Sequence, residues 1–81
     1  MLTQKDKDMA LKFLKTNYPV VRMKDKDRFK RAIVTDGGFI FYLNDKNVYK
    51  QIKVHLNYSL KIVFDMEYQT AENLLDEYFG L

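Results

Sequence analysis

The side chains that could perform acid–base, nucleophilic or metal chemistry in this 81-residue chain are few and widely spaced. There is one histidine, His55, and no cysteine, which excludes a thiolate metal site or a disulfide framework. His55 has no second histidine and no carboxylate at ligand spacing, as a metal site or an acid–base pair would need. The hydroxyls of Thr35, Ser59 and Thr70 lack the strand–turn–helix elbow that activates a nucleophile. We therefore predict no enzymatic activity, no metal and no cofactor.

Two short motifs resemble fragments of binding loops. Asp25 and Asp27 are spaced like a carboxylate pair, but the bases between and beside them raise the cost of holding a cation. Residues 36–38, Asp-Gly-Gly, resemble part of a phosphate-binding loop, but they lack the Lys-Ser/Thr that follows in such loops. We interpret the first motif as a solvated loop and the second as a turn.

The basic residues are distributed unevenly along the chain. All 14 lysines and arginines lie at or before Lys61, where only six acids accompany them, so that this part carries a net charge of +8. The last twenty residues carry five acids and no base, a net charge of −5. Such asymmetry affects partners and encounter rates rather than the fold.

Helices are predicted at both ends of the chain. The first runs from about Thr3, a suitable N-cap, to Asn17, because Pro19 disfavours helical backbone at the residue before it. The last begins near Thr70 and ends at Gly80. Each has an apolar stripe at helical spacing, made of Met9, Ala10, Phe13 and Leu14 in the first and of Ala71, Leu74, Leu75, Tyr78 and Phe79 in the last.

A β-hairpin is predicted between the helices. Asp36-Gly37 between two apolar runs is a strong signal for a two-residue turn. That turn pairs Ala32 with Phe41 and places one set of residues inward: Ala32, Val34, Phe39, Phe41 and Leu43. The opposite, outer face carries Phe29, Arg31, Ile33, Ile40 and Tyr42. A slip of one residue would exchange the two faces.

The segment Val48–Phe64 has two interpretations. Read as strands, every even position from Ile52 to Ile62 is apolar, and a turn at residues 57–59 pairs Leu56 with Leu60 on one face. Read as a helix capped by Asp45, the segment has one apolar stripe, made of Val48, Tyr49, Ile52 and Leu56, but leaves Val54 exposed. In the strand interpretation, the same turn also pairs Val54 with Ile62 and Ile52 with Phe64 on that face. Because all three pairs are apolar, we favour a second hairpin.

We therefore expect one α+β domain spanning residues 1–81. Its predicted order is α-β-β-β-β-α, a mainly antiparallel sheet covered on one face by the two terminal helices, with α-β-β-α-β-α as the alternative. The large residues on the inward faces, Phe13, Phe41, Leu75 and Tyr78, are expected to form the core.

The outer sheet face is the predicted binding surface. It combines apolar, aromatic and basic groups, as a protein interface rimmed by charge does: Phe29, Arg31, Ile33, Ile40, Tyr42, Lys53, His55 and Lys61. The alternative without a binding role is that the aromatic residues shield a small sheet from solvent and the lysines keep the protein soluble.

A basic stretch gives the alternative, binding of nucleic-acid phosphates: Arg22, Lys24, Lys26, Arg28, Lys30 and Arg31. The order of elements is similar to that of the double-stranded-RNA-binding domain. However, that family has a lysine cluster where this last helix opens with Thr70-Ala71-Glu72, so we claim no membership.

These observations together favour a small non-enzymatic binding protein. Its size and its richness in Lys, Asn, Asp and Tyr suit an accessory protein of a phage or other mobile element that occupies a surface on a host protein, plausibly one that handles nucleic acids. Direct nucleic-acid binding is the alternative, and self-association stays open. We expect a soluble, cytoplasmic protein, because the sequence shows no apolar leader and no run of about 18 apolar residues.

Overall fold

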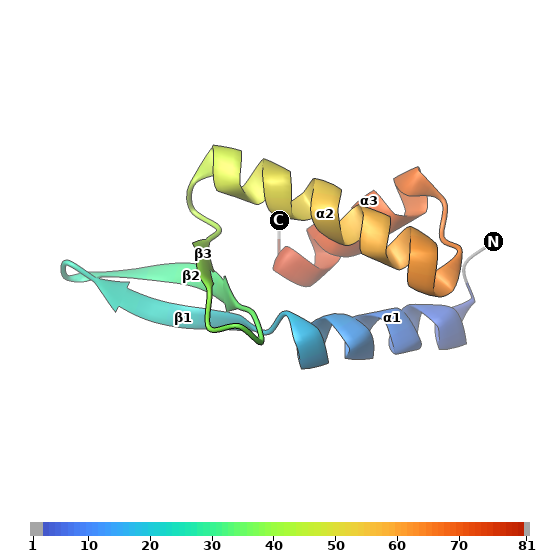
Figure 1. Ribbon diagram of the computed structural model, residues 1–81, viewed down its shortest axis with the longest axis horizontal. Helices are drawn as coiled ribbons and strands as arrows, with labels where there is room; N and C mark the ends of the chain where they lie inside the picture. The colour runs from blue at the N-terminus through green and yellow to red at the C-terminus, as the bar shows by residue number, and fades with distance from the viewer. Residues whose placement is uncertain (1–2, 81) are drawn as a thin grey trace.

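Three helices and a three-stranded antiparallel sheet make up residues 3–80, the residues that the computed structural model describes (Figure 1). The order along the chain is α1 (Gln4–Asn17), β1 (Val20–Asp25), β2 (Arg28–Val34), β3 (Ile40–Tyr42), α2 (Lys46–Phe64) and α3 (Tyr68–Phe79). The predicted α+β class is confirmed. The order is α-β-β-β-α-α, which differs from both predicted orders.

The two terminal helices lie where the sequence predicts them. The Thr3 hydroxyl accepts a hydrogen bond from the Asp6 N–H at 3.1 Å, which satisfies one of the free N–H groups of the first turn. At the other end of the chain, Gly80 follows α3 with a left-handed φ of 77°, and its N–H donates to the carbonyl oxygens of Asp76 and Glu77. A left-handed glycine is a common helix end. The last helix begins at Tyr68, two residues before the predicted Thr70.

The predicted second hairpin is wrong, because residues 46–64 form the single helix α2. The Asp45 carboxylate caps it by accepting hydrogen bonds from the N–H groups of Asn47 and Val48. The apolar even positions divide between two opposite sides of this helix. Ile52, Leu56 and Leu60 are buried, whereas Val54, Tyr58 and Ile62 are exposed. Residues four apart share a helix face, so two helical stripes two residues out of phase imitate the alternation of a strand.

The predicted hairpin at residues 36–38 is present, but its register differs by one residue. The Gly38 N–H donates to the Thr35 carbonyl, the Thr35 N–H donates to the Phe39 carbonyl, and Gly38 has a φ of 81°. This is a three-residue turn with a left-handed glycine in its last position. Ala32 therefore pairs with Tyr42 instead of Phe41. Ile40 and Tyr42 share the face of Ala32, and Phe39 and Phe41 share the face of Ile33.

β1 was missed, because its residues were interpreted as the start of a solvated loop. It pairs antiparallel with β2, from Val20 opposite Ile33 to Asp25 opposite Arg28. The connecting turn, Lys26-Asp27, has two positive φ angles, 45° and 67°. Two-residue turns of this kind usually contain Asn-Gly or Asp-Gly. Lys-Asp gives no such signal.

The core lies among the helices and at the adjoining end of the sheet. α1 contributes Ala10 and Leu14, β2 contributes Ile33, and Leu43 follows directly after β3. The remaining members come from α2, α3 and the connection between them: Ile52, Leu56, Leu60, Met66, Ala71, Leu74, Leu75 and Phe79. Burial of Leu75 is confirmed, and Phe13 and Tyr78 are partly buried against the cluster. The expected burial of Phe41 is wrong, because the slipped register leaves its side chain 39% exposed.

The far part of the β1–β2 hairpin projects from this body. Figure 1 shows the three helices grouped at one end of the sheet, rather than across one face as predicted, with the hairpin extending away from them. The molecule is accordingly elongated, with extents of 43 × 21 × 21 Å. We refer to residues 22–31 as the arm.

Candidate functional site

The structure separates the residues predicted to form one outer sheet face. Lys53, His55 and Lys61 lie on α2. The remaining residues divide between the two faces of the sheet. Phe29, Arg31 and Ile33 lie on the face that meets the core, and Ile40 and Tyr42 lie on the other face. Ile33 itself is buried in the core.

The largest exposed apolar group on the sheet lies at β3. Phe39, Ile40 and Phe41 are 66%, 43% and 39% exposed, and Tyr42 is half-buried. We call these four residues the β3 surface. β3 is an edge strand, because the strand order is β1-β2-β3. Side chains alternate along a strand, so the β3 surface presents apolar groups on both faces of the sheet edge.

A groove lies on the core-facing side of the β3 surface. It has a volume of about 490 Å³, and its walls come from β2, β3, α2 and the end of α1. Phe39 and Phe41 line it from the sheet, and Ile52, His55 and Leu56 line it from α2. An apolar concavity of this size is suited to receiving apolar side chains of a partner. The His55 ring lies edge-on to Tyr18, with ring centres 6.5 Å apart, which is a packing role.

The six bases of the basic stretch have different surroundings. The Arg31 guanidinium donates to the Phe79 carbonyl at the end of α3, where a cation is favourable. The Lys30 ammonium lies 3.1 Å from the Asp25 carboxylate and 5.4 Å from the centre of the Tyr42 ring. The other four bases, Arg22, Lys24, Lys26 and Arg28, have exposed side chains.

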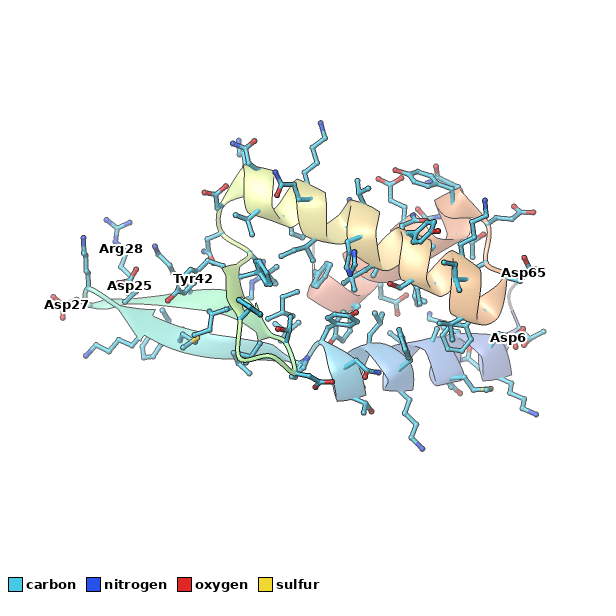
Figure 2. All side chains as sticks on the ribbon, viewed as in Figure 1. Asp6, Asp25, Asp27, Arg28, Tyr42 and Asp65 are labelled. Atoms are coloured by element: carbon cyan, nitrogen blue, oxygen red, sulfur yellow. The ribbon has the colours of Figure 1, made fainter. Side chains whose placement is uncertain are left out.

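Figure 2 shows how these groups are distributed along the molecule. Arg28 lies with Asp25 and Asp27 at the free end of the arm, and Tyr42 lies nearer the helices. Asp6 and Asp65 lie at the opposite end of the molecule. The basic arm and the apolar β3 surface therefore adjoin, and Arg28, Phe29 and Lys30 line one groove with Ile40, Phe41 and Tyr42.

A polar cluster joins α2 to α3. The Lys53 ammonium lies 2.7 Å from the Asp76 carboxylate and 3.4 Å from that of Glu72, and the Tyr49 hydroxyl donates to Asp76 at 3.1 Å. The hydrogen bond to Asp76 raises the pKa of Lys53, and the same bond lowers the pKa of Asp76. Burial raises the pKa of Tyr49. A catalytic lysine or tyrosine needs the opposite shift to become a base near neutral pH. The cluster therefore fits a structural role.

One exposed surface was not anticipated from the sequence. Val54, Tyr58 and Ile62 form the outward stripe of α2, each more than half exposed. Val54 and Tyr58, together with Lys61 and Tyr68, border a second groove of about 500 Å³. The signal was present as the spacing of four residues in these positions. The helical interpretation left Val54 exposed, whereas the favoured strand interpretation faced Val54 and Ile62 inward and placed Tyr58 in a turn.

Among residues 3–80, no group of three or more His, Cys, Asp or Glu side chains is placed to hold a metal ion. In the same part of the chain, no helix is long and apolar enough to cross a membrane.

Comparison of the chain with models of known protein families, with curated proteins and with solved structures finds no match. The arguments for function therefore come from the chain's own residues.

Proposed function

We propose that this chain is a non-enzymatic protein-binding module whose partner docks on the β3 surface. The observation that carries the proposal is the exposure of three consecutive large apolar residues: Phe39, directly before the edge strand β3, and Ile40 and Phe41 within it. Exposed apolar groups that lie together on a small domain are typical of interaction sites. An exposed edge strand also offers free backbone groups to another chain.

The surroundings of β3 support this proposal. The groove beside Phe39 and Phe41 can accept side chains of the partner, and an aromatic anchor in such a site usually dominates the binding energy. Lys30 and His55 border the β3 surface and supply a polar rim, as interfaces commonly have. The partner that we propose is a host protein that handles nucleic acids.

A variant at Phe39 tests the proposal. Phe39→Ala removes the most exposed of the large apolar side chains and should leave the fold intact. Ile62→Ala is the matched control, because Ile62 is 64% exposed on α2, away from β3. Each form is immobilised, a nuclease-treated host lysate is passed over it, and the retained proteins are identified. Their dissociation constants are then measured with the purified partner.

The proposal expects a specific protein that is retained after nuclease treatment by the unmodified chain and by Ile62→Ala. Phe39→Ala should weaken binding of that protein about 30-fold or more, the effect of a central interface residue. Loss of all capture after nuclease treatment would overturn the proposal. A stronger effect of Ile62→Ala than of Phe39→Ala would also overturn it, since the site would then lie on the outward stripe of α2.

A further inference from the structure

The arm carries positive charge on both of its faces and at its tip. Arg22 and Lys24 are two residues apart on β1 and therefore share a face. Arg28 pairs with Asp25 and lies on the other face, and Lys26 occupies the turn. A flat binding site would need the bases on one side only. Charge on both sides suits a ligand that has anions on two sides of the arm.

The four charges are not neutralised within the described part of the chain. Among residues 3–80 the recorded salt bridges involve Lys7, Lys30 and Lys53, and none involves Arg22, Lys24, Lys26 or Arg28. Asp25 already pairs with Lys30, which leaves Asp27 as the one other acid on the arm. Residues 22–30 therefore carry five bases and two acids, a net charge of +3.

Phe29 gives one face of the arm a planar, rigid element. Its side chain is 57% exposed, and the Arg22 guanidinium carbon lies 4.6 Å from the centre of its ring. The attraction between the guanidinium charge and the face of the ring restricts the motion of the Arg22 side chain. Arg22 is thus oriented before any ligand arrives, which lowers the entropy lost on binding.

The shape of the arm selects among polyanions. It is a two-stranded ribbon that extends beyond the helices (Figure 1). The major groove of B-form DNA is about 12 Å wide, admits such a ribbon and has a row of phosphates on each side. The major groove of A-form RNA is deep and too narrow for it. A single strand carries one row of phosphates and would meet one face only.

We propose that the arm enters the major groove of double-stranded DNA, where Arg22, Lys24, Lys26 and Arg28 neutralise phosphates on the two flanking strands. Contacts of this kind position a protein on DNA and carry little sequence information. None of these four bases belongs to the β3 surface, although Arg28 lines a groove together with Ile40, Phe41 and Tyr42.

Binding of a short fluorescent DNA duplex, measured by anisotropy between 50 and 200 mM salt, tests the proposal. Four neutralised phosphates give a slope of about −3.6 in log K against log salt, which is a roughly 150-fold loss of affinity over this range. Competition with two cationic groove ligands shows which groove of the duplex the arm occupies. The major-groove ligand methyl green should displace the protein at concentrations where the minor-groove ligand netropsin does not.

Two double variants distinguish the effect of the arm's bases on DNA binding from the effect of the protein's net charge. Arg22→Gln with Lys24→Gln should weaken binding and reduce the slope to about −1.8. Lys12→Gln with Lys15→Gln removes two exposed bases from α1, makes the same change in net charge and should keep the slope near its original value. Circular dichroism of both variants checks that each is folded.

Several results would overturn the proposal. They are absence of duplex binding at 50 mM salt, equal loss in the two double variants, and displacement by netropsin in place of methyl green. Equal or tighter binding of a double-stranded RNA, a single-stranded DNA or heparin would show that the arm is a general polyanion site. Phe39→Ala should bind the duplex normally, so failure of the proposed protein-binding function would leave this result unchanged.

Discussion

Arg28 and Arg31 lie three residues apart on β2 and have opposite surroundings. The Arg31 guanidinium donates to the Phe79 carbonyl and fixes the sheet to the end of α3, whereas Arg28 is exposed at the tip of the arm. The sequence places both in one basic stretch and cannot distinguish them. The distinction depends on a contact between residues 48 positions apart along the chain.

Arg31→Ala should destabilise the protein by about 1.5–3 kcal/mol, because it removes a charge-assisted hydrogen bond and leaves a helix-terminal carbonyl without its partner. Arg28→Ala should change the free energy of unfolding by less than about 0.5 kcal/mol, as is usual for surface positions. Urea denaturation of the two variants measures both values. Equal stabilities would show that the Arg31 contact contributes nothing to the fold.

Asp76 should make stability depend on acid pH. The hydrogen bond from Lys53 holds the pKa of Asp76 below its ordinary value of 3.8. A group whose pKa is lowered by folding stabilises the protein above its unfolded pKa, and this stabilisation is lost as the pH falls through the folded pKa. Asp76→Asn should therefore be less stable than the unmodified chain at pH 6, and the difference should shrink below about pH 4. Denaturation curves across this range measure it, and a difference that stays constant to pH 2 would contradict the assignment.

At the scale of elements, Leu60 and Ile62 distinguish the helix α2 from the predicted hairpin. A strand would place both on one face, whereas α2 buries Leu60 and leaves Ile62 64% exposed. Leu60→Ala should cost about 2–5 kcal/mol, as deletion of a buried leucine side chain does. Ile62→Ala should cost less than about 1 kcal/mol. Thermal or urea unfolding gives both numbers, and similar losses would support the strand.

Elements marked by local signals were predictable, and those decided by distant packing were not. Thr3, Pro19 and Gly80 act on the adjacent backbone, so both terminal helices could be located from the sequence. The β3 register depends on Gly38 taking a left-handed conformation, which Asp36-Gly37-Gly38 permits but does not require. The α2 pattern fits two periodicities, and burial against α3 selects one of them.

The candidate site was predictable only in part, because Phe39 and Phe41 of the β3 surface were expected to face inward and are 66% and 39% exposed. Ile40 and Tyr42 were expected on one exposed sheet face, and they share one. Lys53, His55 and Lys61 were assigned to that face through the wrong hairpin, and they lie on α2 instead. An error in one element therefore displaced three candidate residues together.

At the scale of the whole molecule, the net positive charge is concentrated in the arm. Residues 22–31 carry six bases and two acids, a net charge of +4, whereas the rest of the chain carries eight bases and nine acids, a net charge of −1. The acids of α3 are partly neutralised by salt bridges within the chain, because Glu72 and Asp76 pair with Lys53, and Glu77 pairs with Lys7 at 3.0 Å. This pairing supports a structural role for the acidic helix. A separation of charge would orient the molecule, arm first, toward a polyanion.

The arm should be separable from the fold. The described core takes no residue from the segment between Val20 and Ala32, so packing of the helices does not depend on the tip. Met23 pairs with Lys30 in the hairpin, and a two-residue Asn-Gly turn can close that pair. Replacing residues 24–29 by Asn-Gly should therefore leave the unfolding transition of the helices within about 0.5 kcal/mol, the range of surface changes.

The same shortened chain separates the two proposed surfaces, because it removes Lys24, Lys26 and Arg28 and keeps all of the β3 surface. Duplex DNA binding should be lost, while capture of the protein partner should persist at the affinity of the unmodified chain. Hydrogen exchange of the unmodified chain should agree with this, with amides near the tip exchanging through local opening and those of α2 and α3 through global unfolding. A shortened chain that fails to fold would show that the arm supports the core. One that folds but loses the protein partner would place the partner on the arm instead of β3.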